Sequence, residues 1–309
     1  MTTLLISHPA SFNHLNGAGH PERPDRMRAV ESALSDEKFQ SLIRVQAPLA
    51  DFETVALCHP MDYIEAIREA APQEGRVQLD ADTAMSPGTL EAALRAVGGA
   101  VHAVDEVVAG RADNAFVAHR PPGHHAESVR PMGFCIFNQA AIAARHAQKK
   151  HGLDRVAVVD FDVHHGNGTQ ELFWSDPTLM YGSTHQMPLY PGTGAVGERG
   201  EHDNIVNAPL SSGDGGERFK EAMLSRILPR LAAFAPELVV ISAGFDAHRR
   251  DPLASLELVE QDFGWATRKI MEVAEQTAGG RVVSVLEGGY DLEGLAKSVA
   301  EHVLALMRG

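Results

Sequence analysis

The chain has 309 residues, of which 44% are hydrophobic and 22% are charged, as in ordinary globular proteins, so the composition excludes a disordered or fibrous chain. This length fits a single large α/β domain and does not require two. The formal net charge of −14 excludes a general attraction to nucleic-acid phosphates or anionic lipid surfaces. We therefore expect no nucleic-acid partner and no membrane partner, whereas an acidic surface attracts basic peptides and polyamines.

The cysteines and the first residues indicate a reducing compartment. Cys58 and Cys135 are the only cysteines, and their wide spacing matches neither a disulfide framework nor a CxxC metal site. Residues 1–8 contain a short apolar run without the basic flank or cleavage site of a signal peptide, so we expect a first strand there. Because no stretch reaches the roughly 18 to 20 apolar residues of a membrane span, we expect a cytoplasmic protein.

Short apolar, β-branched runs alternate with longer helical patterns along the chain, which is typical of βαβ units around a parallel sheet. After the first strand, we expect these elements in chain order: a helix from Ser86-Pro87 to Gly110, a strand from Asn114 to Ala118, a helix from about Gln139 to Lys150, a strand from Val156 to Asp160, a helix from about Arg218 to Phe234, a strand from Leu238 to Ser242, a helix from Glu260 to Ala278, a strand from Val282 to Leu286 and a helix from Gly294 to Met307. Ser86 is the expected N-cap of its helix, with Pro87 at the first helical position. No repeat or polar linker divides the chain, so we predict one α/β domain spanning residues 1–309.

Titratable residues and glycines follow four of these strands. Parallel α/β sheets place their sites beyond the carboxyl ends of the strands, so these segments are expected to meet. The segments are His119-Arg120-Pro121-Pro122-Gly123-His124-His125, Asp160-Phe161-Asp162-Val163-His164-His165-Gly166-Asn167-Gly168, Ser242-Ala243-Gly244-Phe245-Asp246 and Leu286-Glu287-Gly288-Gly289-Tyr290.

Asp162, His164 and Asp246 form a candidate metal site. The first two are two residues apart at the end of a strand, where a pleated backbone aims both side chains to one side. Asp246 follows another strand and supplies a third ligand, leaving a fourth position for water or substrate, as catalytic zinc sites do. A salt-bridged polar cluster explains a lone Asp-x-His pair better, but the third carboxylate favours a metal.

Other residues in these segments supply acid–base and oxyanion chemistry. The adjacent imidazoles of His124 and His125 titrate near physiological pH, and Asp160 is placed to orient one of them. Gly289 allows close approach to a ligand beside Tyr290, whose phenol can stabilise an oxyanion. Alone, two histidines or a tyrosine are more often structural; with a metal site they describe metal-activated water attacking an acyl group.

The same residues carry a resemblance to the histone deacetylase superfamily, especially its class II and bacterial deacetylase-like members, the histone deacetylase-like amidohydrolases, which are related to acetylpolyamine amidohydrolases. The matching motifs lie in the family's order over residues 119–290, and the N-terminal loop His20-Pro21-Glu22-Arg23-Pro24-Asp25-Arg26 is similar too. The resemblance implies the arginase–deacetylase fold, a central eight-stranded parallel sheet flanked by helices. It implies one Zn²⁺ bound by Asp162, His164 and Asp246, His125 as general base and acid, His124 paired with Asp160, and Tyr290 as the group that polarises the carbonyl. It also implies a K⁺ site from the backbone carbonyls of Asp160, Asp162, His164 and Thr184 and the side chain of Ser183.

The resemblance further implies a substrate tunnel lined by Gly133, Phe134, Tyr190 and Leu253. The family usually has phenylalanine where Tyr190 stands, so this departure adds a hydroxyl at the rim and leaves the exact side-chain preference open. Leu253 stands where related polyamine deacetylases carry an acidic gatekeeper, and Arg249 and Arg250 nearby are expected to repel a polycation. We therefore expect acyl-lysine peptides or small neutral-tailed acylamines as substrates, in preference to acetylpolyamines.

Three further interpretations bear on the same motifs. Asn167 replaces the acidic partner that class I enzymes give the second histidine, so we hypothesise that His125 is more readily neutral. A binuclear manganese ureohydrolase of arginase type is disfavoured because Gly166 and His248 stand where its additional aspartates would be. A catalytically dead acyl-lysine binder is disfavoured because His125 and Tyr290 are both present. The sequence leaves homo-oligomerisation and the loaded metal open, Fe²⁺ and Co²⁺ being alternatives to Zn²⁺.

Overall fold

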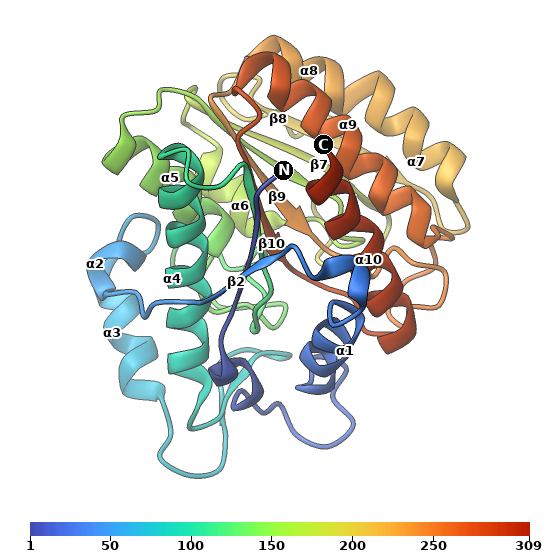
Figure 1. The fold of residues 1–309 in the computed structure, drawn as a ribbon. Helices are drawn as coiled ribbons and strands as arrows, with labels where there is room; N and C mark the ends of the chain where they lie inside the picture. The colour runs from blue at the N-terminus through green and yellow to red at the C-terminus, as the bar shows by residue number, and fades with distance from the viewer.

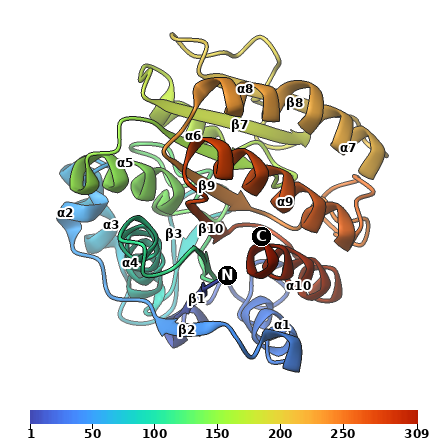
Figure 2. The ribbon, with the colours of Figure 1, turned by 45° about the horizontal axis from the view of Figure 1, so that its top comes forward.

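The computed structural model describes residues 1–309 and has an eight-stranded, all-parallel sheet at its centre (Figures 1 and 2). The strand order is β2-β1-β5-β10-β9-β6-β7-β8. The strands are β1 (Thr3–Ser7), β2 (Ile43–Gln46), β5 (Asn114–Val117), β6 (Val156–Asp160), β7 (Leu179–Gln186), β8 (Ile205–Leu210), β9 (Leu238–Ala243) and β10 (Val282–Leu286). A separate antiparallel pair, β3 (Val77–Gln78) and β4 (Ala84–Met85), lies outside this sheet. The expected eight-stranded α/β architecture is confirmed.

Helices cover both faces of the sheet. One face is covered by α1 (Asp25–Ala33), α7 (Gly216–Ala222), α8 (Leu228–Phe234), α9 (Glu260–Thr277) and α10 (Leu292–Arg308). The other face is covered by α4 (Thr89–Val108), α5 (Gln139–His151) and α6 (Asn167–Phe173), and α2 (Phe52–Val55) and α3 (Met61–Ala70) pack outside them. Figure 2 shows α4 and α5 on one side of the sheet and α9 and α10 on the other. Short 3₁₀ turns occur at Pro9–Phe12 and Glu37–Phe39.

The alternation of side chains along the strands produces two cores, one on each face of the sheet. In β6, Ala157 and Val159 pack into the core beneath α9 and α10, whereas Val156 and Val158 pack into the core beneath α4 and α5. All five residues of β6 are buried and the first four are apolar, as is typical of parallel strands between two helical layers.

Three expected helices differ in their details. Thr89, rather than Pro87, begins α4, and Ser86 does not cap it, because the Ser86 hydroxyl accepts a hydrogen bond from the backbone of Leu15 instead. The expected helix at residues 218–234 contains a π-helical segment, Met223–Ile227, directly before α8. This wider turn lies where Pro229 would otherwise leave a backbone carbonyl without its i+4 donor.

The last helix begins before Gly294. The Asp291 carboxylate accepts a hydrogen bond from the backbone N–H of Gly294 and so starts α10 at Leu292.

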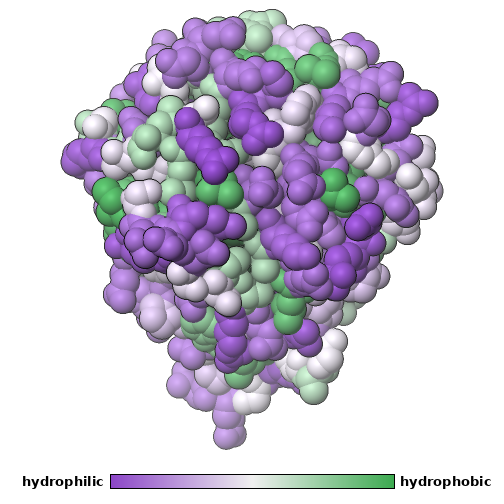
Figure 3. Space-filling model, turned by 45° about the vertical axis from the view of Figure 1, so that its right-hand side comes forward, coloured by the Kyte–Doolittle hydropathy of each residue, from purple (hydrophilic) through white to green (hydrophobic).

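The four strands that precede the polar segments are neighbours in the sheet. The order β5-β10-β9-β6 brings the loops after these strands to one edge, although up to about 170 residues of sequence separate them. No helix of this fold is both long enough and apolar enough to cross a membrane. On the face shown in Figure 3, hydrophilic residues predominate and hydrophobic residues form small patches between them.

Candidate active site

A pocket of about 250 Å³ opens at the carboxyl edge of the sheet. Its lining combines groups from several loops: Asp82, His125, Gly133, Phe134, His164, Leu189, Tyr190, Leu253 and Tyr290. The structure thus brings together the four expected tunnel residues, the expected base, one expected metal ligand and the expected tyrosine. Asp82 and Leu189 are lining residues that the sequence did not single out.

Asp162, His164 and Asp246 converge at the base of this pocket. The Nδ1 atom of His164 lies 3.2 Å from Oδ1 of Asp162 and 3.1 Å from Oδ2 of Asp246, and the three potential ligand atoms lie within 4.8 Å of one another. Asp162 and His164 lie in the loop after β6, not on the strand itself, so the strand-pleat argument for their common direction is wrong. Backbone hydrogen bonds aim them instead: the N–H of His164 donates to Asp162, and the N–H of Gly288 donates to the other oxygen of the same carboxylate.

This cluster fits a divalent cation. The carboxylates of Asp160, Asp162, Asp246 and Glu287 are all at most 1% exposed and lie together, so uncompensated negative charge would be buried without a cation. Burial lowers the pKa of His164, but hydrogen bonds to Asp162 and Asp246 outweigh it and raise the pKa to about 10. The site thus demands positive charge, which either an imidazolium or a metal that replaces its proton can supply.

Two glycines shape the space around these carboxylates. A Cβ atom at Gly244 would lie 2.1 Å from Oδ2 of Asp162, and one at Gly288 would lie 2.1 Å from Oδ2 of Asp246. Only glycine therefore lets these two loops close around the cluster. One carboxylate-rich cradle with an imidazole nitrogen suits Zn²⁺ or a similar transition metal.

His125 is held in the tautomer that a general base needs. Its Nδ1 lies 2.8 Å from the side-chain oxygen of Asn167, whose amide nitrogen donates to Glu127 at 2.8 Å. Because the amide nitrogen faces Glu127, the amide oxygen faces His125, and Nδ1–H of His125 donates to it. Nε2 of His125 then carries the lone pair and is available to accept a proton from a molecule in the pocket. Burial first, and then the nearby His124 and His164, hold the pKa of His125 well below its usual value.

His124 lies directly beside His125, with ring centroids 4.0 Å apart. Its Nδ1 lies 2.9 Å from Oδ2 of Asp160, which also accepts a hydrogen bond from the Tyr181 hydroxyl at 2.9 Å. Burial lowers the pKa of His124, but the carboxylates of Asp162 and Asp160 outweigh it and hold the pKa well above its usual value. A divalent cation on Asp162 would oppose that rise. The two histidines are therefore differentiated by their partners, a carboxylate for His124 and an amide for His125.

Gly133 and Phe134 form a left-handed turn against the imidazole of His125. Their φ angles are +57° and +68°, and a Cβ atom at Gly133 would lie 2.3 Å from Cδ2 of His125. The chain passes so close to the imidazole that no side chain fits. The turn places the ring of Phe134 in the pocket wall, where its centroid lies 5.9 Å from that of Tyr290 and 4.8 Å from that of His20.

Two buried charged residues fix the loop that carries Tyr290. Arg26, from the N-terminal motif, donates from Nε to the Gly289 carbonyl at 2.7 Å, and its guanidinium lies 5.0 Å from the Tyr290 ring centroid. Asp251 accepts hydrogen bonds from the backbone N–H groups of Tyr290 at 2.7 Å and Leu253 at 3.0 Å. Asp251 thus ties the tyrosine loop to the loop that carries Leu253. The phenol oxygen of Tyr290 hydrogen-bonds to no protein group.

Arg26 itself is held by a buried ion-pair cluster. Glu22, also from the N-terminal motif, accepts hydrogen bonds from Arg26 and from both Nε and Nη2 of Arg120, and all three side chains are 0% exposed. This cluster explains why the motif at residues 20–26 accompanies the catalytic segments: it anchors the N-terminal loop beneath the site.

The distribution of charge at the mouth of the pocket differs from the one expected. The expectation that Arg250 repels a polycation is wrong. Asp291 and Glu293 bind its guanidinium at 2.9 and 2.7 Å and offset its positive charge. In addition, Asp82 places a carboxylate in the pocket wall. One oxygen of Asp82 accepts a hydrogen bond from the N–H of Gly133 at 3.0 Å. Sequence reasoning missed the roles of Asp82 and Asp251 because these roles come from contacts with Gly133 and Tyr290, which are distant in the sequence.

Gly166 lies where a binuclear enzyme would need a further carboxylate. A Cβ atom there would lie 2.5 Å from both Asp160 Oδ2 and the Tyr181 hydroxyl, so any side chain is excluded. His248 is buried in the loop after β9 and does not line the pocket. The surroundings therefore favour one metal ion.

Ser183 and Thr184, which were expected at a K⁺ site, lie in β7, beside the loop that follows β6. Ser183 is the register partner of Asp160, and its hydroxyl lies 2.9 Å from Nδ1 of His185. The hydroxyl of Thr184 is buried without a hydrogen-bond partner.

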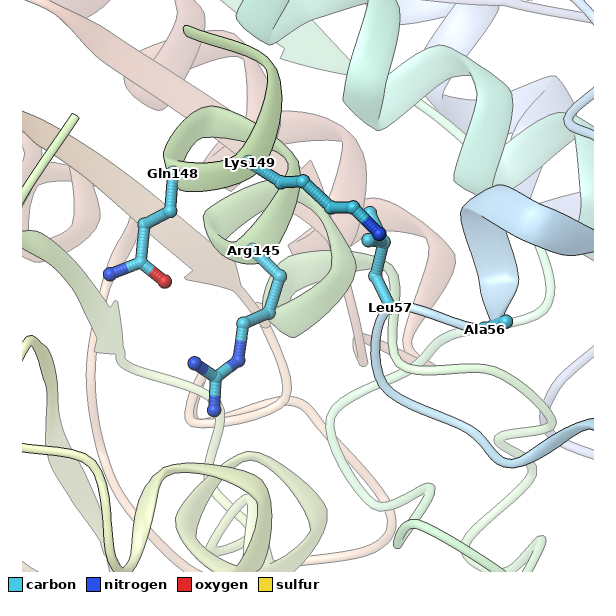
Figure 4. A pocket seen from close by; sticks show the side chains of 5 residues that line it. All are labelled: Ala56, Leu57, Arg145, Gln148 and Lys149. Atoms are coloured by element: carbon cyan, nitrogen blue, oxygen red, sulfur yellow. The ribbon is translucent and has the colours of Figure 1, made fainter. Parts of the chain in front are cut away.

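A larger surface hollow of about 470 Å³ lies elsewhere, between α5 and the segment after α2. Figure 4 shows Arg145, Gln148 and Lys149 extending from α5, with Ala56 and Leu57 completing the lining. This hollow contains no carboxylate, histidine or nucleophile, and Asp176 binds the Arg145 guanidinium. It lacks the groups that hydrolysis requires.

Comparisons with known proteins place these features in context. Residues 20–306 match the family model of the histone deacetylase domain. A histone deacetylase-like amidohydrolase of Pseudomonas aeruginosa is 40% identical over 279 residues, which cover 88% of this chain and 73% of that protein. The human polyamine deacetylase HDAC10 is 38% identical over 302 residues, which cover 93% of this chain and 44% of that protein. The crystal structure of the HDA15 HD domain is similar with a TM-score of 0.93 and 33% identity, covering 99% of this chain and 88% of that one.

Proposed function

Because this chain belongs to the histone deacetylase family, we propose that it is a zinc-dependent hydrolase that removes acetyl or similar acyl groups from lysine side chains or small acylamines. Membership of the family indicates a deacetylase-type hydrolase; the metal, the residue roles and the substrate are the proposal. One observation carries it: a buried ligand cluster, the lone-pair side of His125 and the unpaired phenol of Tyr290 meet in the same pocket.

The metal would be held by Asp162, His164 and Asp246. When bound there, Zn²⁺ would polarise the substrate carbonyl and lower the pKa of the attacking water. A K⁺ ion beside Ser183 and Thr184, with carbonyls of Asp160, Asp162 and His164, belongs to the same proposal and would steady the loop after β6.

The protein groups then handle the protons. Nε2 of His125 takes the proton of the attacking water, since Asn167 holds the other ring nitrogen as a donor. The same imidazole, once protonated, returns the proton to the leaving amine. His124, paired with Asp160, remains a fixed neighbour that stabilises the charge of the reacting groups. The Tyr290 hydroxyl donates to the carbonyl oxygen as negative charge develops on it.

The pocket dimensions favour an acylated side chain as the group that enters. Its volume of about 250 Å³ lies below the roughly 300–1,000 Å³ of pockets that enclose whole small ligands, so the rest of the substrate would remain outside. Phe134 and Tyr190 provide aromatic walls for an alkyl chain, and Leu253 adds an apolar contact. These features support acyl-lysine substrates.

An acetylpolyamine is the second candidate substrate, and Asp82 is the observation that favours it. Its carboxylate lines the pocket and would attract the distal ammonium group of such a substrate, and the human relative is a polyamine deacetylase. We rank it second because Leu253 brings no charge to the position where an acidic gatekeeper would stand.

Specificity constants and metal content test these proposals. For the purified protein, kcat/KM for acetyl-lysine peptides should exceed that for acetylspermidine and acetylputrescine. A tenfold preference for the acetylpolyamines would reverse the substrate assignment, and absence of turnover with every acylamine would favour a binding module. Asp162→Ala should lose one metal ion and all activity; simultaneous loss of two ions would favour the binuclear ureohydrolase, and full metal retention would refute the ligand assignment.

A further inference from the structure

A second cluster of potential metal ligands lies on α4 and α5 and shares no residue with the pocket described above. Asp105 is in the last part of α4, and His146 and His151 are in the last part of α5. Oδ1 of Asp105 lies 2.8 Å from Nε2 of His146 and 2.7 Å from Nε2 of His151. Two imidazole nitrogens and one carboxylate oxygen therefore meet at one point, and all three atoms lie within 4.8 Å of one another.

The packing of α4 against α5 creates this convergence. The two helices contribute mainly alanines to the core that they share, including Ala100 and Ala103 from α4 and Ala140 and Ala144 from α5, and small side chains allow helices to lie close together. The cluster occupies the polar edge of that contact. Its side chains are 22% exposed for Asp105, 12% for His146 and 19% for His151, so they are sheltered but accessible to an ion.

The ligand spacing resembles that of the catalytic cluster. There, an imidazole nitrogen lies 3.1–3.2 Å from two carboxylate oxygens. Tetrahedral zinc with ligand bonds of about 2.0–2.2 Å separates its ligand atoms by roughly 3.3 Å, so each of the two distances between Asp105 and an imidazole needs to lengthen by only about 0.5 Å. Two imidazoles and one carboxylate, with the remaining positions open to water, are typical ligands of Zn²⁺, Ni²⁺, Co²⁺ and Cu²⁺.

Lys150 is the competing cation in this region. Its ammonium group lies 2.8 Å from Oδ2 of Asp105, whereas both imidazoles approach Oδ1. The carboxylate thus presents separate oxygens to the lysine and to the histidines. Lys150 is also 56% exposed, so it can move away without breaking any buried contact.

We propose that Asp105, His146 and His151 form a second divalent transition-metal site, which ties the end of α4 to the end of α5 and is separate from the catalytic pocket. Ion binding replaces the Nε2 protons of the two histidines, which move to Nδ1. The occupied site stabilises the pair of helices, and it takes no part in the hydrolysis.

Zinc counting on matched variants tests this site. Wild type and the double variant His146→Gln/His151→Gln are dialysed against the same buffered Zn²⁺ solution, and bound zinc per chain is measured by mass spectrometry. We expect the double variant to hold one equivalent fewer than wild type and to keep its deacetylase activity. In wild type whose catalytic site already holds zinc, further Zn²⁺ at a hundred times the dissociation constant of the second site should raise the unfolding midpoint by on the order of 5 °C, and this rise should disappear in the equally loaded double variant.

Two controls separate a metal site from an ion-pair cluster. Lys150→Gln removes the competing cation, so this variant should bind the extra zinc as tightly as wild type or more tightly. His202 is an exposed histidine outside the cluster, so His202→Gln should leave the zinc content unchanged. Cu²⁺ added to the zinc-loaded protein should give an electron paramagnetic resonance spectrum with two nitrogen ligands that the double variant lacks. Equal zinc content in wild type and double variant would overturn the proposal, whatever the occupancy of the catalytic site.

Discussion

Replacing Gly133 by alanine should impair catalysis far more than it impairs stability. The new Cβ atom would lie 2.3 Å from Cδ2 of His125, and because carbon atoms pack best at about 3.5–4.0 Å, the imidazole must move by roughly 1 Å. A displacement of that size at a reacting group costs about a hundredfold in rate. The left-handed backbone at φ +57° adds a strain of about 1–2 kcal/mol to the folded state.

The matched control is Gly110→Ala. Gly110 has a similar φ of +68°, but a Cβ atom there has nothing within 4 Å, so this variant carries the strain without the displacement. Turnover of a fluorogenic acetyl-lysine amide and unfolding in urea should show similar losses of stability for the two variants. Only Gly133→Ala should lose about a hundredfold in kcat/KM. Activity of Gly133→Ala within threefold of wild type would refute the argument, and so would an equal loss of activity in Gly110→Ala.

Three further predictions concern the tyrosine loop and a buried histidine. Tyr290→Phe should lower kcat about a hundredfold to a thousandfold with unchanged metal content, and unchanged kcat would show that the phenol does not contact the reacting carbonyl. Asp251→Asn leaves only one oxygen acceptor for the N–H groups of Tyr290 and Leu253, so the free energy of unfolding should fall by about 1–3 kcal/mol. The kcat should fall as well, while the metal content stays constant. A wild-type kcat would refute the positioning role of Asp251. Burial lowers the pKa of His302 to about 3. Unfolding exposes its ring to protonation below about pH 6.5, so the free energy of unfolding should fall by up to about 1.4 kcal/mol per pH unit between pH 6 and 4. In urea titrations, the free energy of unfolding of His302→Gln should fall less steeply over that range. Equal dependence on pH in the variant and wild type would refute this.

The central strands were predictable because their composition reflects their position. Residues 156–159 are all apolar, and residues 282–286 are apolar except for Ser284. The site at the polar segments after them follows from the rule that parallel sheets place sites at the carboxyl ends of strands. The strand β7 escaped prediction because its second half, Ser183–Gln186, is polar and buried near the site. The edge strands β2 and β8 lack the pattern as well: β2 is largely exposed, and β8 contains Pro209, which an edge strand tolerates.

The site was predictable only where its residues occur in compact motifs. Asp162, His164 and Asp246 each follow a strand, and their convergence was expected because parallel sheets place sites beyond the carboxyl ends of strands. Asp82 and Asp251 could not be assigned from the sequence, because their importance comes from backbone groups of Gly133 and Tyr290 that are 51 and 39 residues away. Likewise, the charge of Arg250 was misjudged because its partners, Asp291 and Glu293, lie on another element.

The position of β10 in the middle of the sheet has a consequence for biosynthesis. β10 is the last strand of the sheet in the chain, yet it pairs with β5 on one side and β9 on the other. Until residues 282–286 leave the ribosome, both of those buried, apolar strands have an open edge, which is the kind of surface that pairs with other chains. A nascent chain of this protein should therefore depend on chaperones until residues 282–286 have emerged, and the same segment that closes the sheet delivers Tyr290 to the pocket.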